Sequence, residues 1–127
     1  MKNPATLFFA TGAIFVLIGM GWGIQMSATQ DHSLSAAHAH LNLIGFVVMS
    51  VYGTYYALTP SAAAARLAWI HYALATLSVV VMIPGIVMAI REVDETAVKL
   101  GSLLVVASMA LFLYTVLRKG VGRAGAA

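Results

Sequence analysis

The chain has 127 residues, of which 61% are hydrophobic and only 9% are charged. Polar groups are therefore too few to cover a soluble globule, and the composition indicates an integral membrane protein. The net charge of +3 is read as a signal of membrane orientation, and it gives no support for nucleic-acid binding. The chain contains no cysteine, which excludes thiolate metal ligands, covalent haem attachment and disulfides.

Four apolar segments, nearly free of Lys, Arg, Asp and Glu, are each close to the roughly 20 residues that an α-helix needs to cross a bilayer core. They cover residues 5–26, 36–58, 67–90 and 98–117. Because the connections are short and the composition does not shift, we expect one all-α domain over residues 1–127, an integral membrane four-helix bundle. We expect the first segment to be a span, because it is longer than the apolar run of a secretory signal.

Charged residues divide between the two ends of these spans. One side carries the basic residues Lys2, Arg66, Arg118, Lys119 and Arg123. The other side carries the acidic residues Asp31, Glu92, Asp94 and Glu95, together with Arg91 and Lys99. The positive-inside rule then predicts that both termini are cytoplasmic, and we expect the inner membrane of a bacterium.

Two histidines, His38 and His40, lie just inside the start of the second apolar segment. Ionisable side chains at membrane depth are costly and are usually retained for ligand, ion or proton chemistry, and a neutral imidazole suits iron or copper. On a helix the two rings differ by about 3 Å in height but point about 200° apart. One helix therefore cannot place both on opposite faces of one porphyrin, but each can serve a different site.

The two faces of this segment differ in character. One face is polar, small and aromatic, and it carries His38, Asn42, Gly45, Met49, Tyr52 and Tyr56. The opposite face is mostly aliphatic, and it carries His40, Ile44, Val47, Val51 and Thr54. Since an imidazole facing lipid is unfavourable, the second face predicts that another subunit covers it.

The other histidines and the aromatic residues have alternative interpretations. His71 lies roughly 16 Å above the inner turn and His40 roughly 30 Å above it, so one haem cannot bridge them. His71 is predicted to face the bundle, either as an interhelical hydrogen-bond partner of a carbonyl or Tyr, or as a further metal ligand. His32 is expected to be solvated, with metal contact as the alternative. An aromatic belt is predicted for Tyr52, Tyr55, Tyr56, Trp69 and Tyr72.

The run Ala37-His38-Ala39-His40 resembles the His-x-His motif of the tenth helix in subunit I of the haem-copper oxidases and nitric oxide reductases. Ala-His-Ala before an aliphatic span is also similar to the haem-ligand stretch of that subunit's second helix. A weaker likeness lies in the run from Trp69 to Tyr72. The chain thus resembles short four-span bacterial proteins that correspond to one arc of this subunit.

The resemblance implies a homotrimer that reproduces a twelve-helix oxidase-like plan. In it, His38 of one subunit and His40 of its neighbour take the two axial positions of one haem b. Arg91 pairs with the haem propionates, or alternatively with Glu95 four residues later. The family's copper-ligand cluster and membrane carboxylates are missing from this sequence, so proton-pumped oxygen reduction by this chain alone is not expected.

The leading hypothesis is a membrane b-type haem protein that transfers electrons or binds O₂ or NO near the outer face. It is a possible oxidoreductase, but a simple electron carrier is favoured over an enzyme. One alternative is a copper-binding protein that uses His38, His40, His32 and nearby methionines. Another is a structural assembly subunit without a cofactor. Expected partners are membrane lipid, further copies of the chain and an electron donor whose identity the sequence does not give.

Overall fold

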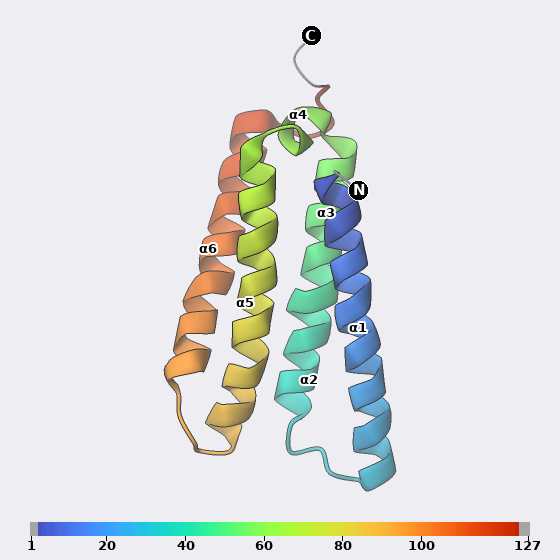
Figure 1. The fold of residues 1–127 in the computed structure, drawn as a ribbon, viewed down its shortest axis with the longest axis vertical. Coiled ribbons are helices and arrows are strands. Elements are labelled where there is room, and N and C mark those ends of the chain that lie inside the picture. Colours follow the sequence, from blue (N-terminus) through green and yellow to red (C-terminus); the bar gives the residue numbers. More distant parts are fainter. Residues whose placement is uncertain (1–2, 125–127) are drawn as a thin grey trace.

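The computed structural model describes residues 3–124, and this part of the chain is built from helices. The helices are α1 (Pro4–Thr29), α2 (Ser35–Asn42), the π-helical turn η1 (Leu43–Val47), α3 (Val48–Leu58), α4 (Pro60–Ala63), α5 (Arg66–Ile90) and α6 (Thr96–Lys119). Since α2, η1 and α3 continue into one another as a single rod, the described chain has four helices long and apolar enough to cross a membrane (Figure 1). The four predicted spans are confirmed, each within three residues of its expected bounds.

The bundle has two chemically different ends. We call the end where α1 begins and α6 ends the terminal end, and the opposite end, with the connections at 30–34 and 91–95, the loop end (Figure 1). The basic residues Arg66, Arg118, Lys119 and Arg123 belong to the terminal end, and the four acidic residues belong to the two connections of the loop end. Lys2 lies outside the described residues. The predicted separation of charge is therefore present in the fold.

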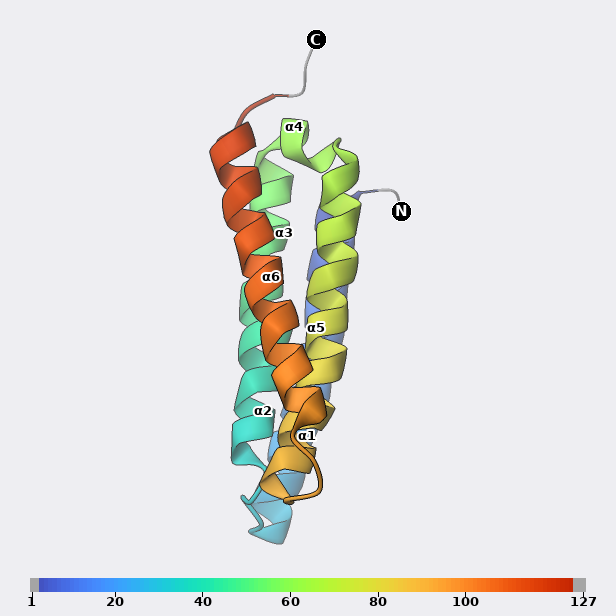
Figure 2. The same cartoon turned by 90° about the vertical axis from the view of Figure 1, so that its left-hand side faces the viewer.

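The helices pair as two antiparallel hairpins, α1 with the α2–α3 rod and α5 with α6 (Figures 1 and 2). Glycines allow the backbones of α5 and α6 to approach each other closely. A Cβ atom on Gly101 of α6 would lie 2.7 Å from Cα of Met82, and one on Gly85 of α5 would lie 2.6 Å from the backbone nitrogen of Val98. Because lipid provides no hydrophobic drive between helices, such backbone contact is a main source of attraction.

The π turn changes the winding of the second span. Its buried residues Ala37, Leu41, Gly45 and Met49 recur at every fourth position. In a regular α-helix, residues four apart rotate by about 40°, so this set would drift away from the interior. The wider turn at η1 offsets the drift and keeps these residues on the inner side of the rod.

Candidate functional site

His38 and His40 point in opposite directions from α2. His38 is half-buried against α1, where a Cβ atom on Gly23 would lie 3.1 Å from its Cε1. Its ring meets the edge of Trp22 with 6.2 Å between the ring centroids. His40 is exposed on the other side of the helix. The prediction that the two rings lie on different sides of this helix is therefore confirmed.

His40 is held by a hydrogen bond within its own helix. Its Nδ1 lies 2.7 Å from the carbonyl oxygen of Ala36, one turn earlier. A carbonyl can only accept, so Nδ1 carries the proton and Nε2 of the neutral ring keeps a free lone pair. Metal-ligating histidines commonly donate their other ring N–H in this way, which sets the tautomer and the ring orientation. The hydrogen bond to Ala36 therefore fixes the tautomer and the orientation of the exposed His40 ring.

The His38 side contains polar atoms that the chain leaves unsatisfied. Within the described residues, Nδ1 of His38 and Oδ1 of Asn42, one turn later, are buried without a hydrogen-bond partner. Leaving such a group unpaired costs about 1–3 kcal/mol. Asn42 packs against Gly19 so closely that a Cβ atom there would overlap its amide oxygen. Of the three glycines near the end of α1, Gly19 and Gly23 make room for this polar pair.

Arg91 lies beside a cavity of about 540 Å³ at the loop end. The cavity is lined by Ile18, Trp22, Gln25, Met26, Asp31, Ser33, Leu34 and Arg91. Glu95 pairs with Lys99 at 3.6 Å between Oε2 and Nζ, so the alternative pairing of Glu95 with Arg91 is not formed. Trp22 lines this cavity together with Arg91 and also packs against His38.

The Asp31 carboxylate at the rim of this cavity is stabilised in its charged form. Hydrogen bonds from Ser33 are the main cause that lowers the pKa of Asp31, and the nearby His32 and Arg91 lower it further. The backbone N–H of Ser33 donates to Oδ1 of Asp31 at 3.0 Å. The loop end therefore presents an anion and a cation on one cavity wall.

His71 lies in the interior, in an aromatic cage near the terminal end. Its side chain is completely buried, and its Nδ1 lies 3.0 Å from the Tyr56 hydroxyl of α3. The rings of Tyr52, Phe8 and Phe112 surround it, with centroids 4.3, 5.4 and 6.0 Å from its own. The prediction of an interhelical hydrogen bond to a tyrosine is thus confirmed. Its role as a metal ligand stays a prediction.

The predicted aromatic belt is wrong for the three tyrosines of α3. Tyr52, Tyr55 and Tyr56 are 2%, 6% and 1% exposed. They pack around His71 and the end of α6 because their hydroxyls find partners inside the bundle. The Tyr55 hydroxyl, for example, donates to the carbonyl oxygen of Gly120 at 2.7 Å. Tyr52 and Tyr56 share the face of His38 in the sequence pattern, but that pattern does not identify the partners that bury them.

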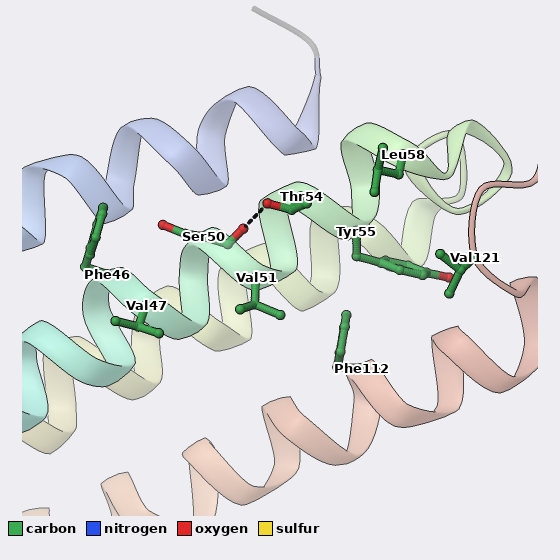
Figure 3. Close-up of a pocket in the computed structure, with 9 residues that line it drawn as sticks. All are labelled: Phe46, Val47, Ser50, Val51, Thr54, Tyr55, Leu58, Phe112 and Val121. Atoms are coloured by element: carbon green, nitrogen blue, oxygen red, sulfur yellow. Dashed lines mark hydrogen bonds between the residues drawn. The ribbon is translucent and has the colours of Figure 1, made fainter.

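The outward face of the rod, which we call the His40 face, is not covered by the chain itself. It consists of His40, Val47, Val51 and Thr54, all of them exposed. Toward the terminal end it borders an apolar groove of about 480 Å³ between α3 and α6 (Figure 3). The Thr54 hydroxyl donates to the Ser50 carbonyl at 2.8 Å, so its polar group is already satisfied. An exposed imidazole thus stands on an otherwise apolar face, as predicted.

No set of three or more His, Asp or Glu residues that would hold a metal ion occurs within residues 3–124. His32, His38 and His40 are therefore not grouped within one chain, and the copper-binding alternative stays a prediction. No protein-family model, curated protein or solved structure matches the chain.

Proposed function

We propose that this protein is a membrane b-type haem protein in which His40 ligates the haem iron from the surface of its own subunit. The observation that carries the proposal is the bond from Nδ1 of His40 to the Ala36 carbonyl, because it leaves Nε2 as an outward-facing ligand atom. An exposed imidazole on an apolar membrane face is costly unless a partner or ligand covers it.

His38 of an adjacent copy would be the second residue that holds the haem. His38 is two residues from His40, so the two rings lie at nearly equal depth when identical subunits stand side by side. The unpartnered Nδ1 of His38 supports a role for this ring beyond packing. Arg91, which lines the loop-end cavity near Trp22, supplies a cation for the haem propionates.

The assembly that this arrangement calls for is a homotrimer. A closed threefold ring gives each His38 a neighbouring His40 and leaves no ligand unused. The apolar His40 face and the groove beside it are the contact surface, which removes the exposed imidazole from lipid. Twelve spans result, in the bacterial inner membrane, with both termini in the cytoplasm as the basic residues of the terminal end favour.

Held by both histidines, a haem would supply one-electron transfer, and held by one of them it would allow binding of O₂ or NO. The chain contributes the orientation of the ligand through Ala36, the exclusion of water by the apolar His40 face, and a cation through Arg91. An electron carrier is the favoured activity, with reduction of O₂ or NO as the extension if a position is open. Its electron donor is a separate partner.

The test is optical spectroscopy of the purified protein in oxidised and reduced form, together with the haem content per chain. We expect a Soret band with sharp reduced alpha and beta bands. His40→Ala and His38→Ala should each abolish the low-spin spectrum. His32→Ala is the matched control, because His32 is an exposed loop histidine, and it should leave the spectrum intact.

His71→Ala should alter the spectrum little, because His71 is enclosed by aromatic rings close to the other end of the bundle. An unchanged spectrum after loss of His40 would contradict the proposal. Bound copper without a Soret band would indicate the copper-binding alternative. Absence of both would indicate a structural assembly subunit.

A further inference from the structure

A second cavity lies at the terminal end, far from the histidines of α2. It encloses about 120 Å³ between the α4–α5 connection and the last turns of α6. Its lining residues are Ala62, Ala65, Leu67, Tyr114, Thr115, Arg118 and Lys119. A water molecule occupies roughly 30 Å³ in the liquid. The cavity therefore has room for a group of a few heavy atoms, such as a phosphate.

The cations at this cavity are at the end of the bundle that has no acidic side chain. The four acidic residues of the whole sequence, Asp31, Glu92, Asp94 and Glu95, all belong to the loop end. The salt bridge of the described residues, between Lys99 and Glu95, is at that end too. Two cations at one small cavity without an acidic side chain at the same end of the bundle favour an anion as the missing partner.

The carbonyl groups at the end of α6 already have other donors. The Val116 carbonyl accepts from the backbone N–H of Gly120 at 2.8 Å, and the Gly120 carbonyl accepts from the Tyr55 hydroxyl at 2.7 Å. Basic residues in the last turn of a helix often serve these carbonyls. Gly120 and Tyr55 thus serve two of the carbonyls at this end, and Arg118 and Lys119 line the cavity instead.

The cavity also borders the beginning of α5. This helix of 25 residues starts at Arg66, and no side chain caps its N-terminus. Ala65 and Leu67, on either side of Arg66, line the cavity. The first N–H groups of a helix lack intrahelical acceptors and favour negative charge. They add a second source of positive potential to that of the two cations.

We propose that this terminal-end cavity binds a phosphate group, with Arg118 and Lys119 as its charged ligands. In a membrane, the phosphate of an anionic phospholipid head group lies at the depth where spans end, and basic pockets between spans bind such head groups. Free inorganic phosphate has the same chemistry, so both sources are compared. The proposal is independent of the haem site, since it concerns the other end of the bundle.

The experiment is a titration of the purified full-length protein with phosphatidylglycerol in detergent, followed by native mass spectrometry. Phosphatidylcholine, which carries no net charge, is titrated in parallel, and inorganic phosphate is added as a competitor. The double variant R118Q/K119Q is compared with R66Q/R123Q. Both pairs remove two charges from the same end, but only Arg118 and Lys119 line the cavity.

We expect R118Q/K119Q to bind phosphatidylglycerol about tenfold or more weakly than R66Q/R123Q, because hydrogen bonds to charged groups contribute this much affinity. Ala65→Leu keeps all charges but narrows the cavity, and it should weaken binding as well. Competition by inorganic phosphate would extend the site to free phosphate, and lack of competition would restrict it to lipid. Equal losses in the two double variants, or equal binding of phosphatidylcholine, would overturn the proposal.

Discussion

The hydroxyl of Tyr56 lies 3.0 Å from Nδ1 of His71, and both side chains are at most 1% exposed. This hydrogen bond joins α3 to α5 and thus connects the two hairpins of the bundle. Within the described residues, Nε2 of His71 is buried without a partner. Of the two ring nitrogens, only Nδ1 is therefore hydrogen-bonded in this part of the chain, and its partner is Tyr56.

Tyr56→Phe should lower the free energy of unfolding by about 1–3 kcal/mol, because it leaves a second nitrogen of His71 buried and unpaired. Unfolding in mixed micelles with an increasing fraction of denaturing detergent measures the change. Tyr114→Phe is the control, since Tyr114 is 52% exposed, and it should have a much smaller effect. Equal stability of the two variants would mean that the hydrogen bond of Tyr56 makes no net contribution to the free energy of unfolding.

Gly101→Ala should destabilise the α5–α6 hairpin, because the new Cβ atom would lie 2.7 Å from Cα of Met82 and backbone atoms cannot turn aside. Overpacking of this kind costs about 1–3 kcal/mol. Gly21→Ala is the matched control: no atom lies within 4 Å of its added Cβ. The same unfolding assay should show a lower free energy of unfolding for Gly101→Ala. Gly21→Ala should show no decrease, because alanine favours a helix more than glycine does.

Val51→Trp should disrupt the proposed trimer, because Val51 is 51% exposed at the centre of the His40 face and a larger side chain would separate the subunits. Light scattering in detergent should then give the mass of one chain in place of three, with loss of bound haem. Leu103→Trp, on the 69% exposed side chain of Leu103 in α6, should leave the trimer intact. A wild-type protein that is monomeric and still binds haem would refute the shared-site arrangement.

Ser33→Ala should raise the pKa of Asp31 part of the way toward its ordinary value, because it removes the side-chain hydrogen bond, the largest cause of the lowering, and keeps the backbone N–H bond. Since folding lowers this pKa, the stabilisation is complete above the ordinary carboxyl pKa and is lost as the pH falls through the lowered value. Carboxyl ¹³C shifts recorded during a pH titration measure the change. Ser35→Ala, two residues further along, should leave the Asp31 titration where it is.

The sequence alone predicted the four spans, the separation of charge between the two ends, and the opposite directions of His38 and His40. These features depend on local composition and on the regular rise and rotation of a helix. A hydrogen bond from His71 to a carbonyl or tyrosine of another helix was also predicted, because a buried imidazole in a span needs a polar partner. Its particular partner, Tyr56, could not be selected from the sequence.

Two features could not be predicted from the sequence: the burial of the α3 tyrosines and the π turn. A belt and a buried cluster have the same composition, and only the pairing of α5 with α6 decides that Phe112 and the α3 tyrosines enclose His71. Within the π turn, Gly45 packs against Phe15 of α1, where a Cβ atom would lie 3.0 Å from Phe15 Cβ. Such contacts between distant segments leave no periodic signal in the chain.

The wide turn at Leu43–Val47 also separates the tasks of the two halves of the second span. Regular α-helical winding of the same residues would rotate the imidazoles by roughly 100° relative to Tyr52 and Tyr56. Conversion of the π turn to a regular helix at constant chain length would therefore re-aim the outward histidine while the packing around His71 stays in place. The surface that a subunit presents to its neighbour can therefore evolve separately from the packing of its own core.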